Sequence, residues 1–298
     1  MIIAYGDKTM MVSVMVAMLV SAGSAFAAIT VVDDANQTLS LPAPAQRIVS
    51  LAPHATELLF AAGAGDKVVG VSEYSDYPPA AKKISSIGSS ASIDLERIIA
   101  LRPDLIVAWG SGNSAAQLAR LRTLGVPLFD SEPHNFDTIA TSLERLAKLA
   151  GTDTVGRAAA QTFRRRQQVL ATTYQQRPVI GVFFQVWRAP LMTLNDTHMV
   201  SAAIRLCGGK NVFGTLPQLA PTISIEAVLQ ANPETIINGS SIKEDRLGEW
   251  RRFPTLTAVM RGNLIALDTD TMTRPGPRIL EGTEILCKQL DIARSKRK

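Results

Sequence analysis

The sequence lacks the short motifs that identify common classes of enzyme. Its 298 residues contain no G-x-S-x-G, G-x-x-x-x-G-K-[ST] or H-E-x-x-H pattern, and these patterns mark hydrolase nucleophiles, phosphate-binding loops and zinc peptidases. The three histidines, His54, His134 and His198, are far apart in the chain. We therefore predict no catalytic residues, no metal site and no enzymatic activity. The competing hypothesis is a metal-dependent enzyme that uses His54.

Long apolar runs are also absent after residue 27. Before that point, Lys8 precedes the apolar run Met10 to Val20, and Ala25-Phe26-Ala27 is a small-x-small cleavage pattern. This arrangement predicts a secretory signal peptide over residues 1–27, because the apolar run is too short to span a bilayer. A membrane anchor is the alternative. No cysteine stands at the junction, so we expect no lipid attachment there.

Cysteine is scarce, since the chain contains only Cys207 and Cys287. An even number of cysteines in an exported protein favours one disulfide bond. That bond would close a loop of 80 residues (287 − 207). The chain-entropy model gives such a loop a stabilisation of about 4 kcal/mol. Metal binding is the weaker alternative, because two isolated thiols supply half of a tetrahedral site.

The excess of positive charge is modest. The formal net charge is +5 at pH 7, and removal of residues 1–27 leaves it unchanged because Asp7 and Lys8 are lost together. The basic clusters, Arg164 to Arg166 and Arg294 to Lys298, contain no aromatic residues. Nucleic-acid-binding surfaces combine clustered charge with a recognisable motif or aromatic residues. We therefore predict a solvated helix face and a frayed terminus, and no nucleic-acid partner.

Strand-like and helix-like runs alternate along the rest of the chain. Short apolar runs such as Leu105 to Ala108 alternate with amphipathic runs such as Phe136 to Ala150, a pattern that predicts parallel sheets covered by helices in an α/β fold. The proline-free stretch Thr152 to Arg177 predicts one helix of about 39 Å, ended by Pro178. Its apolar face is expected to carry Val155 and Phe163. We predict two similar lobes, residues 28–151 and 178–298, joined by a rigid helix over residues 152–177, with a ligand cleft between the lobes.

The two lobes also share a repeated motif. The segment I-D-L-E at residues 93–96 precedes P-D-L-I at 103–106, and I-S-I-E at 223–226 precedes P-E-T-I at 233–236. In each copy a glutamate, Glu96 or Glu226, lies in the first turn of a predicted helix, where the helix dipole favours a carboxylate by about 0.3–1 kcal/mol. The spacing alone favours this local role. The alternative is that two matched, exposed carboxylates dock onto two basic sockets of a partner.

Candidate ligand residues follow the predicted strands. In open α/β sheets, ligands bind at the carboxyl ends of the strands. These ends carry His54, Tyr74, Trp109, Trp187 and the loop from Asp268 to Arg278. Aromatic residues make up only 5% of the chain, so two tryptophans at strand ends indicate a large, partly apolar ligand. A core role for each aromatic side chain and a helix-entry role for His54 are the alternatives.

Four stretches of the sequence resemble one protein family. They are SLAPHATELLFAAGAGDKVVGVSEYSDYPPAAKK (residues 50–83), LERIIALRPDLIVAWGSGN (95–113), IRLCGGKNVF (204–213) and RPGPRILEGTEILC (274–287). They resemble the periplasmic cobalamin-binding proteins of bacterial ABC importers, in the helical-backbone metal-receptor group that includes haem and ferric-siderophore receptors. The resemblance, from about Arg47 to Leu290, implies two α/β lobes on a rigid helix that closes little on its ligand. It also implies a soluble periplasmic monomer that passes a corrinoid to the permease of an ABC importer, with cobalamin as transported ligand and no cofactor.

The resemblance assigns roles to individual residues. Tyr74 matches the family's ligand-contacting tyrosine, and Trp109 matches a cleft tryptophan. The second-lobe residues that contact the corrin correspond to Asp270, Thr271, Met272, Thr273 and Arg274. Cys207 and Cys287 match the family's disulfide. Glu96 and Glu226 match two glutamates that meet arginines of the permease, which makes docking the favoured role for this pair.

The sequence departs from the family at several aromatic positions. Cobalamin binders carry tryptophan where Ser90 stands, aromatic residues where Thr271 and Met272 stand, and another tryptophan near Ala220. Those rings contact the corrin, and we expect Trp187 and Phe184 to replace them. His54 and Tyr74 leave haem as the alternative ligand, because imidazole and phenolate both bind iron. A ferric chelate is the next alternative.

Overall fold

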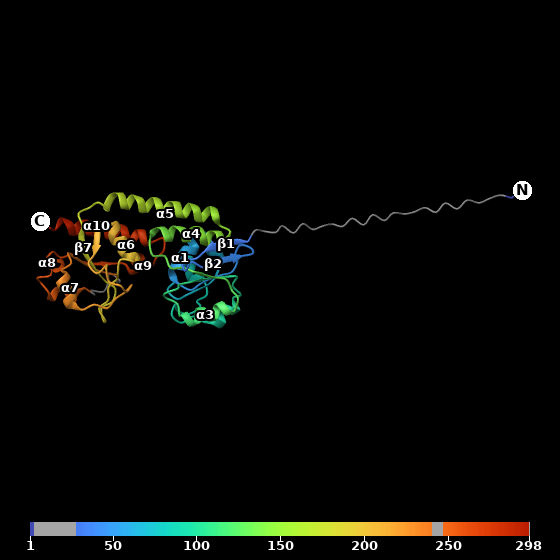
Figure 1. The fold of residues 1–298 in the computed structure, drawn as a ribbon, viewed down its shortest axis with the longest axis horizontal. Helices are drawn as coiled ribbons and strands as arrows, with labels where there is room; N and C mark the ends of the chain where they lie inside the picture. The colour runs from blue at the N-terminus through green and yellow to red at the C-terminus, as the bar shows by residue number, and fades with distance from the viewer. Residues whose placement is uncertain (3–27, 240–246, 298) are drawn as a thin grey trace.

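The computed structural model describes residues 1–2, 28–239 and 247–297. The predicted signal peptide, residues 1–27, therefore lies outside the described residues except for its first two. Two α/β lobes lie side by side, and one long helix, α5 (Asp153–Tyr174), runs over both of them (Figure 1). The predicted fold class is confirmed.

The N-terminal lobe contains a four-stranded parallel sheet in the order β4-β3-β5-β6. An antiparallel hairpin precedes it. The strands are β1 (Ile29–Val32), β2 (Thr38–Leu41), β3 (Ile48–Ser50), β4 (Val68–Val71), β5 (Leu105–Ala108) and β6 (Leu128–Asp130). The helices are α1 (Pro53–Ala61), α2 (Leu95–Ala100), α3 (Ala115–Thr123) and α4 (Phe136–Ala150), with short 3₁₀ turns η1 (Gly65–Lys67) and η2 (Pro79–Lys83).

The C-terminal lobe contains a second four-stranded parallel sheet, in the order β8-β7-β9-β10. In both sheets the strands therefore stand in the order second, first, third, fourth along the chain, so the repeated motif belongs to a repeated topology. The strands are β7 (Ile180–Gln185), β8 (Gly209–Asn211), β9 (Thr235–Gly239) and β10 (Leu264–Leu267). The helices are α6 (Met199–Leu206), α7 (Ile225–Ala231), α8 (Thr257–Met260), α9 (Thr269–Thr273) and α10 (Ile279–Ser295), with the 3₁₀ turn η3 (Gly248–Arg252).

Two short elements differ from the sequence-based expectation. The glycines at 208 and 209 predict only a helix stop, yet residues 209–211 form the edge strand β8, because strand pairing uses backbone groups that every residue here possesses. The expected loop after β10 contains the helix α9. Its formation has a local cause, since the Asp268 carboxylate accepts a hydrogen bond from the backbone N–H of Thr271 at 3.0 Å and caps the turn.

Helix α5 ends at Tyr174, three residues before the expected end at Arg177. The backbone N–H of Arg177 donates to the carbonyl of Tyr174 at 3.0 Å, which closes a tighter turn before the proline. Phe163 is buried as expected, and Val155, although 50% exposed, lies on the same face of α5, where both side chains line one cavity. The buried face contains Gly156 and Ala160, whose small size allows close packing.

Helix α5 is fastened to both lobes. On the N-terminal side, Arg164 pairs with Glu144 of α4 at 2.6 Å. On the C-terminal side, Arg166 pairs with Glu284 of α10 at 3.4 Å. One cluster of buried apolar side chains also passes from the N-terminal lobe, through the buried face of α5, into the C-terminal lobe. The other faces of the two sheets have separate clusters, around Ile106 and around Trp250. The lobes therefore share part of one core.

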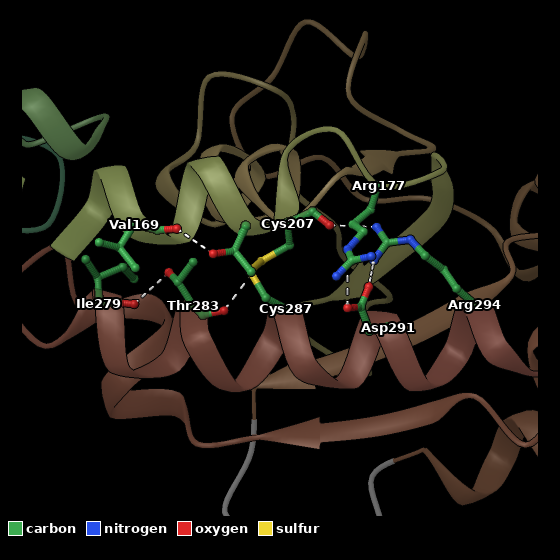
Figure 2. The surroundings of a disulfide bond; sticks show 9 residues. Val169, Arg177, Cys207, Ile279, Thr283, Cys287, Asp291 and Arg294 are labelled. Carbon is green, nitrogen blue, oxygen red and sulfur yellow. Dashed lines mark hydrogen bonds and ion pairs between the residues drawn. A yellow bond between two sulfur atoms is a disulfide. The ribbon is translucent and has the colours of Figure 1, made fainter. Parts of the chain in front are cut away.

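Cys207 and Cys287 form the predicted disulfide, which joins the end of α6 to α10 (Figure 2). Arg294 lies beside it and donates to the Cys207 carbonyl oxygen at 2.6 Å, while it also pairs with Asp291 at 2.6 Å. Both half-cystines are fully buried. In the described ranges, none of the helices combines the length and the hydropathy that a membrane span requires.

Candidate functional site

The predicted ligand residues all lie beyond the carboxyl ends of strands. His54 follows β3, Tyr74 follows β4 and Trp109 follows β5 in the first lobe; Trp187 follows β7 and the segment 270–274 follows β10 in the second. Because all strands within each sheet are parallel, these residues collect at one edge of each sheet. This edge is where α/β sheets bind ligands.

Tyr74 is highly exposed, with 77% of its surface accessible. Its backbone has a φ of 63°, in the left-handed region that a tyrosine rarely adopts. The loop around it is held by short-range hydrogen bonds, from the Ser75 N–H to the Ser72 carbonyl at 3.2 Å and from the Asp76 N–H to the Tyr74 carbonyl at 3.0 Å. Backbone strain of this kind is concentrated at functional sites. We call residues 72–77 the Tyr74 loop.

Arg274 connects the Tyr74 loop to the C-terminal lobe. Its Nη1 lies 2.8 Å from Asp76 in that loop, and its Nη2 lies 2.8 Å from Asp270 in α9. Burial opposes the ionisation of Asp76, but the hydrogen bond and charge of Arg274 outweigh it and lower the pKa of that carboxyl. The Arg274 side chain is 14% exposed. Two predicted ligand segments, one from each lobe, are thus brought into contact.

Trp109 and His54 pack against each other, with ring centroids 5.6 Å apart and nearly perpendicular planes. The indole Nε1 of Trp109 donates to the Glu132 carboxylate at 3.2 Å. His54 is 2% exposed, and its Nε2 lies 3.3 Å from the Ser131 carbonyl oxygen. A carbonyl can only accept, so Nε2 carries the proton. Burial lowers the pKa of His54 to about 4, and the imidazole is therefore neutral at pH 7.

In the second lobe, some of the predicted ligand residues are exposed and others are buried. Trp187 is 54% exposed, and its Nε1 donates to the Ala189 carbonyl at 3.0 Å. Met272 is fully buried, with its sulfur against Gly282, so it packs the core beneath α9. Phe184 is also buried, with 1% exposed. The expectation that Phe184 replaces a missing cleft aromatic is wrong, because its side chain belongs to the shared core.

Sequence reasoning missed Glu57 and named Arg278 only as the end of the candidate loop over residues 268–278. Glu57, on α1, is buried and forms ion pairs with Arg278 and Arg274 of the other lobe. A signal for it was present, because a glutamate within the apolar run A-T-E-L-L-F-A is rarely buried unless it is paired. Its partners lie more than 200 positions away in sequence, so the pairing itself could not be read from local pattern.

Glu96 and Glu226 occupy equivalent places in the two lobes. Each is exposed in the first turn of the helix that precedes the third strand of its sheet, α2 or α7. The caps are Asp94, which accepts from the Arg97 N–H at 2.9 Å, and Ser224, which accepts from the Ala227 N–H at 3.1 Å. The backbone N–H of Glu226 and the Ser224 hydroxyl lower the pKa of the Glu226 carboxyl. Neither glutamate forms an ion pair with another described residue.

A cavity of about 840 Å³ lies elsewhere, beneath α5, with Phe60, Phe163 and Leu280 among its lining residues. The predicted ligand residues do not line it. Position at the strand ends is the stronger guide to the ligand site, because it follows from the topology of both sheets. In the part of the chain that the structure describes, His, Cys, Asp and Glu side chains form no group of three or more suited to a metal ion.

Known proteins share both the sequence and this arrangement. A model of the periplasmic binding protein family matches residues 48–271. The vitamin B12-binding protein of Vibrio cholerae serotype O1 is 42% identical over 260 residues, which is 87% of this chain and 94% of that protein. The crystal structure of the periplasmic vitamin B12 binding protein of Vibrio cholerae matches with a TM-score of 0.78 at 42% identity, over 84% of this chain and 98% of that one. The periplasmic heme-binding protein of Roseiflexus sp. RS-1 matches with a TM-score of 0.73 at 26% identity, over 83% and 98%.

Proposed function

The chain belongs to the periplasmic binding protein family, and from that premise we propose that it binds a corrinoid, cobalamin, and delivers it to an ABC importer. The observation that carries this proposal is the 42% identity, over 87% of the chain, to a protein named for binding vitamin B12. Cobalamin is then the transported ligand and not a cofactor. The relatives are binding proteins, and we propose that this chain likewise performs no reaction on its ligand.

The residues at the strand ends suit such a ligand. A corrin is a broad ring with apolar faces and a rim of amide side groups. Tyr74 and Trp187 are exposed by 77% and 54%, so each offers an aromatic face to a broad apolar surface. Asp270, Thr271, Thr273 and Arg274 offer acceptors and donors to amides, in line with the mixture of apolar walls and a few polar groups found in ligand sites.

Haem is the second candidate, because the heme-binding protein of Roseiflexus has the same fold and Tyr74 presents an accessible phenol. His54 suits iron poorly. Its ring is 2% exposed and its Nε2 is bonded to the Ser131 carbonyl, so ligation would require both contacts to break. This geometry and the sequence identities favour the corrinoid.

Transport requires partners that lie outside this chain. We propose that residues 1–27 direct export to the periplasm and that the mature protein is a monomer. Glu96 and Glu226 are exposed, carry no ion-pair partner among the described residues and stand at equivalent points of the two lobes. We propose that they engage basic residues on the two halves of a permease.

Calorimetric titration of the purified protein with cyanocobalamin, cobinamide and haemin tests the ligand. We expect one cyanocobalamin per chain and a loss of about 30-fold in affinity in Tyr74→Ala, since a central aromatic contact is worth about 2 kcal/mol. The control is Val169→Ala, an exposed apolar residue on α5, which should bind as the parent does. A haemin Soret shift that Tyr74→Phe abolishes, without cyanocobalamin binding, would assign the protein to haem.

A further inference from the structure

Glu57 carries a buried charge that is neutralised across the two lobes. Its side chain is 2% exposed in the middle of α1, and its carboxylate accepts from Arg278 Nη2 at 2.5 Å and Arg278 Nε at 3.0 Å. Arg274 Nη1 lies 3.4 Å away. Both arginines belong to the segment that connects α9 to α10 in the C-terminal lobe. A buried carboxylate costs several kcal/mol unless it is paired in this way.

The same arginines hold the Tyr74 loop. The guanidinium carbon of Arg278 lies 4.0 Å from the centroid of the Tyr77 ring, a distance at which the cation and the ring attract each other. Asp76 pairs with Arg274 at 2.8 Å. The loop that carries the most exposed aromatic residue of the site is therefore attached at two points to the opposite lobe.

On one side of these contacts, a cavity lies where closely packed side chains would otherwise stand. Glu57, Tyr77 and Arg278 also line the cavity of about 840 Å³ beneath α5. A close-packed interior would fix the lobes by contact between side chains, but on this side of the ion cluster the space between α1 and the start of α10 is open. Beside this opening, the Asp76–Arg274 ion pair and the Arg278–Tyr77 contact join the Tyr74 loop directly to the C-terminal lobe, while the shared core and α5 join the lobes elsewhere.

We propose that Glu57 and Arg278 are positioning residues, an inter-lobe pin that holds the Tyr74 loop and Arg274 in their ligand-binding arrangement before the ligand arrives. The proposal rests on the proposed function for the identity of the ligand. The pin acts through Tyr77 and Arg274. A buried ion pair adds little stability over an apolar pair of the same size, and the role left for it is to specify one arrangement.

Two variants test the pin, Glu57→Gln and Arg278→Lys. The first removes the charge at constant size, and the second keeps the charge but loses the paired hydrogen bonds and the stacking. In the ligand-free protein, we expect amide hydrogen exchange in residues 72–77 to rise by about tenfold in each variant. Cyanocobalamin affinity should fall by about tenfold, because a smaller fraction of molecules is ready to bind. The double variant should lose no more than the weaker-binding single variant, since both changes break one unit.

The matched control is Glu234→Gln. Glu234 pairs with Arg297 at 2.7 Å and with Arg261 at 2.9 Å, all within the C-terminal lobe, so its loss should leave exchange in residues 72–77 and ligand affinity unchanged.

Unchanged exchange in Glu57→Gln and Arg278→Lys, with native circular dichroism, would overturn the proposal, as would additive losses in the double variant. If Glu57→Gln does not fold, Arg278→Lys alone decides. If the parent protein binds no cyanocobalamin, the proposed function is wrong. Hydrogen exchange in the ligand-free variants then still shows whether Glu57 and Arg278 hold residues 72–77 in place.

Discussion

His54 illustrates how the surroundings of a side chain change its chemistry. It lies at the end of β3, where a ligand residue is expected, but it is enclosed by Trp109 and bonded to the Ser131 carbonyl. His198 has a comparable setting, since its Nδ1 accepts from the Val200 N–H at 3.1 Å and caps α6. Burial lowers the pKa of each imidazole to about 4. Both rings are structural acceptors or donors in their neutral form.

These histidines predict a loss of stability in weak acid. Their folded-state pKa values, about 4, lie below the ordinary value of 6.5, so the unfolded chain takes up protons first as the pH falls. The stability that each neutral histidine contributes to the folded protein is fully present above pH 6.5 and is lost as the pH falls from 6.5 to about 4. We expect His54→Gln to reduce this loss in the free energy of unfolding by at most about 3 kcal/mol. Urea unfolding at pH 7.5 and pH 4.5 measures it.

His134→Gln is the control for this measurement, because the His134 side chain is exposed. It should keep the pH dependence of the parent protein. An equal loss of stability between the two pH values in the parent and in His54→Gln would contradict the assignment of His54 as a buried neutral imidazole.

At the scale of elements, α4 and α5 form the contact on which the joint between the lobes depends. The chain turns between them at Gly151, which has a φ of 70° that only glycine adopts easily. At Gly156 a Cβ atom would lie 2.2 Å from the Ala147 Cβ and 2.7 Å from the Leu143 carbonyl oxygen. The two helices approach so closely that no side chain fits between them at this point.

Gly156→Ala should therefore destabilise the protein. In an exposed helix the same change stabilises by about 1 kcal/mol, but here α4 and α5 must move apart, at a cost of about 1–3 kcal/mol. Urea unfolding at pH 7.5 gives the difference. Gln161→Ala, at an exposed position of α5, should change the free energy of unfolding by less than about 0.5 kcal/mol. A more stable Gly156→Ala variant would refute the close approach of the helices.

At the scale of the whole molecule, the duplicated topology gives the two lobes equivalent surfaces. Each sheet has the same strand order, and each places its glutamate, Glu96 or Glu226, at the start of the helix before its third strand. Helix α5 and the shared core oppose independent movement of the lobes. The separation of the two glutamates is therefore set by the fold, as a partner with two fixed sockets requires.

The double variant Glu96→Ala/Glu226→Ala should bind cyanocobalamin as tightly as the parent protein and fail to support its uptake by cells. Both carboxylates are exposed, so the fold should tolerate their loss. Calorimetry and uptake of labelled cobalamin measure the two properties. Asp66→Ala/Glu281→Ala removes two exposed negative charges from other surfaces of the lobes and should transport normally. Normal uptake by the first double variant would exclude docking through these residues.

The sequence by itself determined the features that depend on neighbouring residues. Alternating apolar and amphipathic runs specified the α/β order, the absence of proline specified α5, and the presence of only two cysteines specified the Cys207–Cys287 bond. The sequence also showed which candidate residues follow a strand, because this depends only on the order of residues along the chain.

Tertiary structure alone decided which of those side chains are accessible. Phe184 and Met272 proved to be buried, and Glu57 met Arg278 from 221 positions away. The reason is physical: periodicity along a segment records which of its faces is apolar, whereas burial and ion pairing depend on what another segment places against that face. In this protein those neighbours come from the same lobe for Phe184 and Met272 and from the opposite lobe for Glu57, and only folding brings them together.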